Sequence, residues 1–103
     1  MQTGAVRKIQ IEVTARHFKA PKMLRNFAEK EIRKLNRYYD GVMKYHVILT
    51  HETGQEVAEI IAHSKGHQFT AIDSDAKMDR AVVLALEKLK VQMNRYKGKL
   101  VEK

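Results

Sequence analysis

The sequence predicts an α+β fold in the order β-α-β-β-β-α, with a four-stranded mixed sheet and two helices packed on one face. Three observations predict it: an alternating apolar segment near the N-terminus, two long segments with helical periodicity, and three extended segments between them. The length of 103 residues suits a single domain over 1–103. The absence of cysteine excludes a disulfide framework and a cysteine-based zinc site.

The first predicted strand covers 7–14, where Ile9, Ile11 and Val13 alternate with polar residues and would face one side. Three further runs are rich in β-branched and aromatic residues, and glycine-containing turns at 53–54 and 65–66 separate them. These runs cover residues 42–52, 56–64 and 67–74. We expect the first two strands to be parallel, because a helix joins them, and the last three to form an antiparallel meander.

The first predicted helix covers 21–39, with Pro21 in its first turn and the Asp40-Gly41 pair ending it. Its apolar residues recur at helical spacing: Leu24, Phe27, Ala28, Ile32, Leu35 and Tyr39. The last helix is expected to begin near Asp75, as its N-cap, and to reach Tyr96 or beyond. Its predicted core stripe is Met78, Val82, Ala85, Leu89, Met93, Tyr96 and Leu100.

The net charge of +8 is unevenly distributed along the chain. Residues 1–40 have 10 Lys and Arg against 4 Asp and Glu, 41–76 have 2 against 5, and 77–103 have 8 against 3. The two basic blocks largely coincide with the two predicted helices, which would lie side by side. Such a surface favours nucleic acid as the partner, with an anionic membrane as the next candidate.

The last helix has basic residues on both sides of its core stripe. One flank holds Lys77, Lys88, Arg95 and Lys99, with Gln92 at its edge, and the other holds Lys90 and Lys97. This pattern fits either a track that binds phosphates or a solvated helix face. Within 87–100 only Glu87 is acidic, which favours nucleic acid. Reversing the charges at 88, 95 and 99 is expected to cost little stability, because these positions lie off the core stripe.

The first helix adds a second set of cations, namely Lys22, Arg25, Lys30, Arg33, Lys34 and Arg37. Glu29 and Glu31 are spaced to pair with Arg33 and Lys34, so part of this charge fits ordinary helix-surface pairing. Arg16 is expected in the turn before the helix, where an exposed charge is often functional.

Other candidate sites are weaker, and we expect no catalytic residues, no metal site and no cofactor. The five histidines lack helical metal-ligand spacing, and His46 and His51 differ in strand parity, so they should face opposite sides. The acidic segment 73–79 lacks the glycine and glutamate of an EF-hand loop, and Asp79 fits the positive end of a helix instead. Five aromatic side chains could stack on bases, although their spacing favours packing: Phe27, Tyr38, Tyr39, Phe69 and Tyr96.

Three segments carry a resemblance to a known family: "TARHF" at 14–18, "MLRNFAEKEIRKLNRYYD" at 23–40 and "LEKLKVQMNRYKGKL" at 86–100. With these segments the chain resembles the ribosome hibernation promoting factor family, also called the ribosome-associated inhibitor or sigma-54 modulation protein family. The resemblance extends from about residue 9 to residue 100.

The resemblance implies a non-enzymatic cytoplasmic protein that occupies the mRNA and tRNA channel of the small ribosomal subunit under stress or in stationary phase. It implies rRNA as the partner, with no membrane and no small-molecule substrate. The family's basic rRNA-facing positions correspond here to Arg16, Arg25, Lys34, Lys88, Gln92, Arg95, Lys97 and Lys99. The lack of an apolar N-terminal region or membrane-length segment agrees with a cytosolic protein.

The chain departs from the family pattern at three places. Val91 and Glu31 stand where basic residues are usual, and "KMDRAVV" at 77–83 replaces the usual opening of the last helix. The chain also ends soon after that helix, which suggests a short form that cannot pair ribosomes by itself and makes a separate ribosome-dimerising factor a candidate partner.

Two other functions fit the same pattern. Double-stranded-RNA-binding domains also combine two helices with an antiparallel sheet, so a generic duplex-RNA module is one alternative. The older family name suggests the other, a protein-binding modulator of transcription.

Overall fold

The computed structural model describes residues 9–39 and 41–101, and for 98–101 only the course of the backbone. It confirms the order β-α-β-β-β-α. The elements are β1 (Gln10–Arg16), α1 (Lys22–Asn36), β2 (Val42–Glu52), β3 (Gln55–Ser64), β4 (His67–Asp75) and α2 (Met78–Val101).

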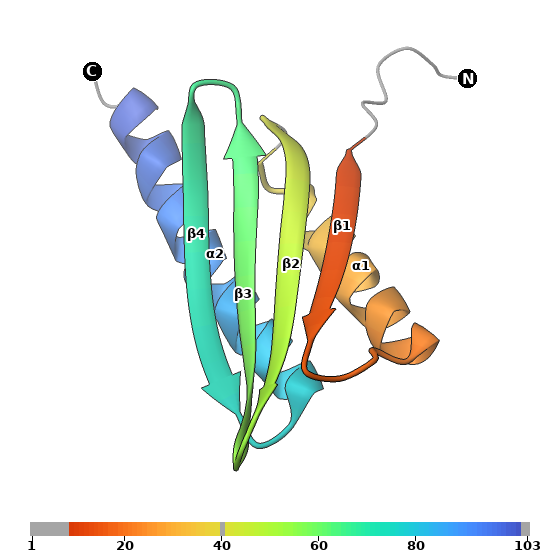
Figure 1. The fold of residues 1–103 in the computed structure, drawn as a ribbon. Helices are drawn as coiled ribbons and strands as arrows, with labels where there is room; N and C mark the ends of the chain where they lie inside the picture. Colours follow the sequence, from red (N-terminus) through yellow and green to blue (C-terminus); the bar gives the residue numbers. More distant parts are fainter. Residues whose placement is uncertain (1–8, 40, 102–103) are drawn as a thin grey trace.

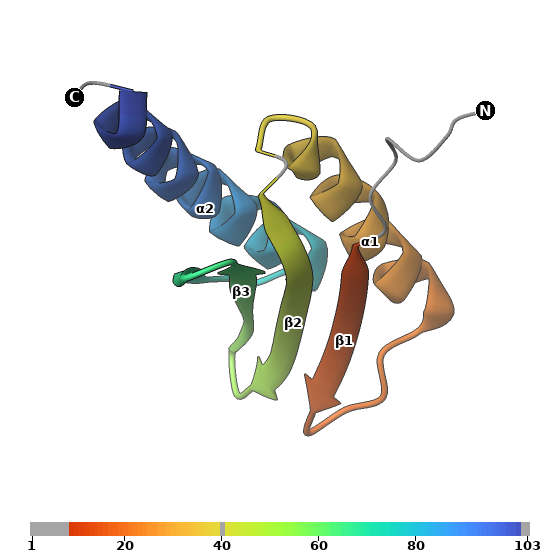
Figure 2. The same cartoon turned by 90° about the horizontal axis from the view of Figure 1, so that it is seen from above.

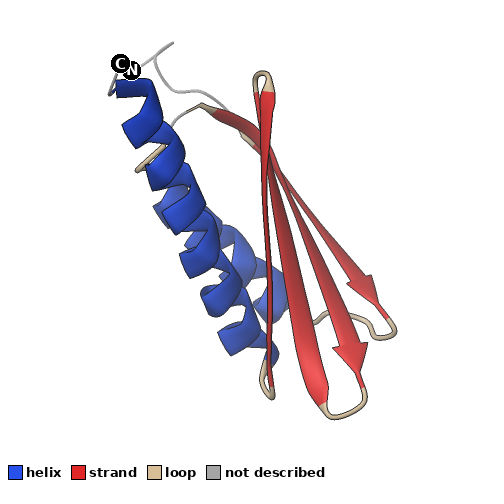
Figure 3. Cartoon of the chain, turned by 90° about the vertical axis from the view of Figure 1, so that its left-hand side faces the viewer, coloured by secondary structure: helices blue, strands red, loops and turns tan. Residues whose placement is uncertain are grey.

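The four strands form one mixed sheet in the order β1-β2-β3-β4. The β1 and β2 strands are parallel, and the other two pairings are antiparallel, as the sequence predicts. Figures 1 and 2 show both helices on the same face of this sheet, with α1 and α2 beside each other. Seen from the side, the described residues form two layers, and none of their helices covers the second face of the sheet (Figure 3).

The core lies between the helices and the sheet. Tyr45, Val47 and Leu49 alternate along β2 and are fully buried, so this parity of the strand faces the helices. The predicted stripes of the helices are confirmed: Ala28, Ile32 and Leu35 of α1 and Val82, Ala85, Leu89 and Met93 of α2 are buried in the same core. Leu24, Phe27, Tyr39, Met78 and Tyr96 pack at its margin, while Leu100 lies outside the described side chains.

Two glycines turn the antiparallel meander. Gly54 and Gly66 have φ angles of 85° and 75°, a conformation that favours glycine because it has no Cβ. They close the β2–β3 and β3–β4 connections at the positions that the sequence predicts.

Several predicted boundaries are wrong by a few residues. The first strand runs from Gln10 to Arg16 instead of 7–14, and residues 7 and 8 lie outside the described part of the chain. Helix α1 ends at Asn36, not at residue 39, because the amides of Tyr38 and Tyr39 bond three residues back in a tighter turn. Pro21 is the N-cap of α1 rather than its first helical residue.

The start of α2 also differs from the prediction. Asp75 is the last residue of β4, where it pairs with Glu56 across the sheet, so it is not the helix N-cap. Its carboxylate instead accepts a hydrogen bond from the Lys77 amide at 3.0 Å and orders the connection to α2. Asp79 lies in the first turn of α2, where the helix dipole favours a negative charge, as predicted.

Candidate nucleic-acid interface

The predicted basic flank of α2 lies beside the edge strand β4. Lys88 and Arg95 are exposed and Gln92 is half-buried, whereas Leu89 and Met93 on the other side of the helix are buried. The helical period therefore separates core and basic residues as the sequence predicts. The side chain of Lys99 lies outside the described residues.

Lys88 is bound within the fold. Its Nζ donates a hydrogen bond to the Ile72 carbonyl at 3.2 Å and lies 3.3 Å from Asp73 Oδ2. A hydrogen bond from the Ser74 amide and the neighbouring Lys88 ammonium lower the pKa of Asp73. The positive charge of Lys88 is therefore partly balanced by a nearby carboxylate.

Gln92 makes a similar contact one turn further along α2. Its Nε2 donates to the Thr70 carbonyl at 2.6 Å, so the side chain lies against the same edge strand. Arg95 is exposed and has no hydrogen bond or ion pair with the described residues, so its guanidinium is free to bind a ligand.

The other flank of α2 faces the end of α1. Lys97 Nζ donates to the Tyr38 carbonyl at 2.7 Å, and Lys90 Nζ lies 4.2 Å from the centroid of the Tyr38 ring. These contacts tie the two helices together near residues 37–39 and engage both lysines. Tyr38 is exposed and carries the cation–π contact, whereas Phe27, Tyr39 and Phe69 pack in or against the core, as their spacing favours.

On α1, the two residues that the resemblance assigns to rRNA, Arg25 and Lys34, also make contacts within the fold. Arg25 Nη1 donates to the Val13 carbonyl on the edge strand β1 at 3.2 Å. Lys34 pairs with Glu31 at 3.2 Å, as the sequence predicts for a helix-surface pair.

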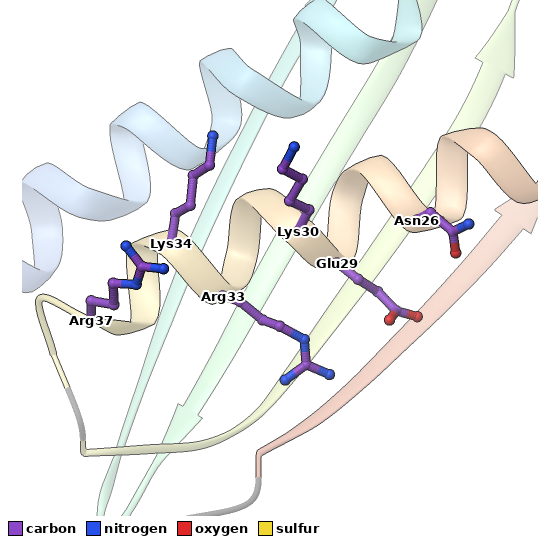
Figure 4. A pocket seen from close by; sticks show the side chains of 6 residues that line it. All are labelled: Asn26, Glu29, Lys30, Arg33, Lys34 and Arg37. Carbon is purple, nitrogen blue, oxygen red and sulfur yellow. The ribbon is translucent and has the colours of Figure 1, made fainter.

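The outer side of α1 carries more cations than Arg25 and Lys34, the two residues of this helix that the family resemblance assigns to rRNA contact. A hollow of about 380 Å³ lies along the helix, and Figure 4 shows the six residues that line it: Asn26, Glu29, Lys30, Arg33, Lys34 and Arg37. Lys30 and Lys34 point to one side of the helix in this view and Arg33 to the other. We call Lys30, Arg33 and Arg37 the α1 cations. Their spacing of three and four residues could have identified them as one surface from the sequence.

Arg16 lies elsewhere. It ends β1 instead of lying in the following turn, and its parity is opposite to that of Ile11 and Val13, which face the core. Arg16 therefore faces the side of the sheet without helices, and the structure does not bring it together with the α2 flank. The next residue, His17, has a φ angle of 70°, which redirects the chain toward α1.

No group of three or more potential metal ligands occurs among the described residues. His46 bonds to Thr14 at 3.0 Å on the side of the sheet without helices, and His51 pairs with Glu56 at 2.9 Å. None of the described helices is both long and apolar enough to cross a membrane.

Solved structures resemble this fold closely. The ribosomal subunit interface protein from Coxiella burnetii matches with a TM-score of 0.83 and 21% identity, over 87% of this chain and 99% of its own. The N-terminal domain of Thermus thermophilus Protein Y matches with a TM-score of 0.77 and 25% identity, over 86% and 99% of the two chains.

Sequence comparison extends this likeness. The ribosome hibernation promoting factor of Acidithiobacillus ferridurans is 34% identical over 73 residues, which is 68% of this chain and 94% of the relative. The factor of the same name from Escherichia coli K12 is 25% identical over 92 residues, or 89% of this chain and 97% of the relative. The model of the family described as "Sigma 54 modulation protein / S30EA ribosomal protein" matches residues 11–101. The chain therefore belongs to the Sigma 54 modulation protein / S30EA ribosomal protein family.

Proposed function

We propose that this protein is a ribosome hibernation factor, which binds the rRNA of the small ribosomal subunit through basic faces of α1 and α2 and inhibits translation under stress or in stationary phase. The observation that carries the proposal is the α1 surface, where four cations and one acid line a single hollow in a chain of this family. The names of the relatives, ribosome hibernation promoting factors, support the same role.

Binding would depend mainly on phosphates. The α1 cations and Arg95 have no ion pair with the described residues, so each can neutralise a phosphate without first losing a carboxylate partner. Phosphate contacts fix position and carry no sequence information by themselves. The shape of the folded rRNA would therefore select the site, as is usual when proteins recognise structured RNA.

We place the protein in the channel between the head and body of the subunit, where it would occlude mRNA and tRNA. It would inhibit by occupying that space and would need no chemical step and no cofactor. It would act as a cytoplasmic protein.

Cosedimentation with three partners tests the proposed function. We expect binding to purified small subunits and much weaker binding to isolated duplex RNA or to RNA polymerase. Equal binding to duplex RNA would support a generic duplex-RNA module, and binding to the polymerase alone would support a transcription modulator.

Competition with initiation tests the place of binding. Small subunits preloaded with mRNA and initiator tRNA should bind much less protein than empty subunits, because the ligands would occupy the same channel. If preloaded and empty subunits bind equally, the protein does not occlude that channel.

A further inference from the structure

A second hollow, separate from the α1 surface, lies between the start of β4 and the C-terminal half of α2. It has a volume of about 240 Å³, and its lining residues are His67, Phe69, Gln92, Arg95 and Tyr96. Figure 1 shows the β3–β4 turn next to this part of α2. The volume is below the range of about 300–1,000 Å³ for drug-sized ligands, so the hollow suits a single small ring system.

Three aromatic rings are arranged in a fixed order in this hollow. The His67 and Tyr96 rings are stacked, with centroids 4.4 Å apart and an interplanar angle of 16°. Phe69 is 2% exposed and meets both rings edge-on, at 4.5 Å from His67 and 5.4 Å from Tyr96. The buried Phe69 ring therefore packs against both rings of the His67–Tyr96 pair.

The stack leaves room for a third ring. His67 is exposed, and Tyr96 covers one of its two faces. A planar ligand can therefore extend the stack on the other face of His67. His67 is the first residue of β4, directly after the turn at Gly66, and Tyr96 belongs to α2, so two regular elements hold the two rings.

The charged side chains around the stack are all positive. Arg95 supplies an exposed guanidinium, and Lys65 lies exposed in the adjoining turn. None of the lining residues is acidic. Gln92 donates through Nε2 to the Thr70 carbonyl, which leaves its Oε1 able to accept a hydrogen bond from a ligand.

An aromatic platform beside cations is the arrangement that proteins use for unpaired bases of single-stranded RNA. A free phosphate would use Arg95 but not the stacked rings, and a base within a duplex has no open face to stack. We propose that this hollow binds one unpaired nucleobase of RNA, which stacks on His67, while Arg95 holds an adjacent phosphate. This subsite rests on the proposed function, since the RNA would be the rRNA of the small subunit.

The test uses two substitutions at His67 and one control. His67→Ala removes the platform, His67→Phe keeps a stacking ring, and Gln68→Ala changes the neighbouring exposed residue, whose parity in β4 is opposite to that of Phe69. We expect His67→Ala to weaken binding to small subunits by about five-fold to a hundredfold, and the other two variants to bind nearly as the wild type. Thermal melts of each variant check that the fold is intact.

A second measurement does not require the ribosome. A short single-stranded RNA carrying one 2-aminopurine should lose fluorescence on the wild type and on His67→Phe, but not on His67→Ala, and the same base in a duplex should not respond. Arg95→Gln should weaken this binding while the bound base is still quenched, which keeps the test informative if His67→Ala fails to fold.

The results separate the subsite from the proposed function. If the wild type quenches the single-stranded probe but does not bind small subunits, the proposed function fails and the base site stands. If the wild type binds small subunits but does not quench the probe, or if His67→Ala matches the wild type in both assays, the base site is overturned.

Discussion

Tyr45 joins the end of α1 to the middle of the sheet. Its side chain is fully buried, and its hydroxyl donates a hydrogen bond to Asn36 Oδ1 at 3.0 Å. Because Asn36 is the last residue of α1, this bond joins the C-terminal end of the helix to β2. A buried hydroxyl with one good partner contributes about 1 kcal/mol to the free energy of unfolding.

Tyr45 should make the protein sensitive to alkali. Burial raises the pKa of Tyr45 above its ordinary value of about 10. The protonated fold is therefore stabilised below about pH 10, and this contribution is lost as the pH rises above that value. We expect Tyr45→Phe to cost about 1 kcal/mol near pH 8 and to lose less stability than the wild type between pH 8 and about pH 11. Urea unfolding at both pH values measures this, and parallel losses in the two proteins would contradict it.

Charge reversal at Lys88 should lower the stability of the protein more than charge reversal at Arg95, although the sequence analysis expects a small effect at both positions. Lys88→Glu would place a carboxylate beside Asp73 and the Ile72 carbonyl, where the wild type has two favourable contacts. Arg95→Glu disturbs no such contact and should stay within about 0.5 kcal/mol of the wild type.

Thermal melts of the two variants compare these sites directly, and Lys88→Gln serves as a control that keeps a donor without reversing the charge. We expect Lys88→Glu to melt below Arg95→Glu, with Lys88→Gln nearer the wild type. Equal melting temperatures would show that the Lys88 contacts add nothing to the fold. That result would support the expectation from the sequence that reversing the charges of this flank costs little stability.

Side chains from the helices cover both edges of the sheet. Arg25 donates to Val13 on the edge strand β1, and Lys88 and Gln92 donate to Ile72 and Thr70 on the edge strand β4. Exposed edges invite pairing with strands of other molecules, so these donors protect the sheet as well as carrying charge. Three of the predicted rRNA contacts thus have a structural use in the fold.

Removing the cover from β4 should promote self-association. Lys88→Ala combined with Gln92→Ala frees the Ile72 and Thr70 carbonyls to accept bonds from another chain. We expect the double variant to form larger species than the wild type as its concentration increases, as measured by light scattering. Asn94→Ala, an exposed change on the same helix, is the control and should behave as the wild type. A double variant that scatters like the control would show that the edge needs no cover.

The elements that the sequence predicts best are those set by local signals. The β2 strand runs from Val42 to Glu52 as predicted, because β-branched residues fill it and a glycine turn ends it. The boundaries that fail depend on tertiary contacts. Asp75 belongs to β4 because it pairs with Glu56, and that pairing joins residues far apart in the chain. Periodicity contains no information about such partners.

The same limit applies to the candidate site. The helical period correctly separates the basic flanks of α2 from its core stripe. It cannot show that Lys97 is bound to the Tyr38 carbonyl, 59 residues away, or that Gln92 is bound to Thr70, 22 residues away. These acceptors are backbone groups, which every residue has, so the sequence does not mark them. The fold alone distinguishes the engaged cations from those that can neutralise phosphate.

On the scale of the whole molecule, the positive charge belongs mainly to the helical layer. The α1 cations and Arg95 lie on the helices, whereas Lys44 in β2 pairs with Glu12 at 3.2 Å. The hydrogen bond from Lys44 and its positive charge lower the pKa of Glu12, so the Glu12 carboxylate stays charged at physiological pH and offsets the nearby lysine. RNA should therefore approach the helical layer, and the salt dependence of binding should report the cations of that layer.

This asymmetry can be measured as a salt slope. Each phosphate contact contributes about 0.7–0.9 to the slope of log affinity against log salt concentration, because it releases counterions. Replacing the α1 cations together, by Lys30→Gln, Arg33→Gln and Arg37→Gln, should therefore reduce the slope for binding to small subunits by about 2–3. The three side chains lie outside the core, so the variant should remain folded in a thermal melt. Lys44→Gln is the matched control, which removes one lysine whose charge Glu12 already balances, and its slope should stay close to that of the wild type. If the triple variant keeps the wild-type slope, or if Lys44→Gln lowers the slope as much per residue, the α1 surface does not contact rRNA phosphates.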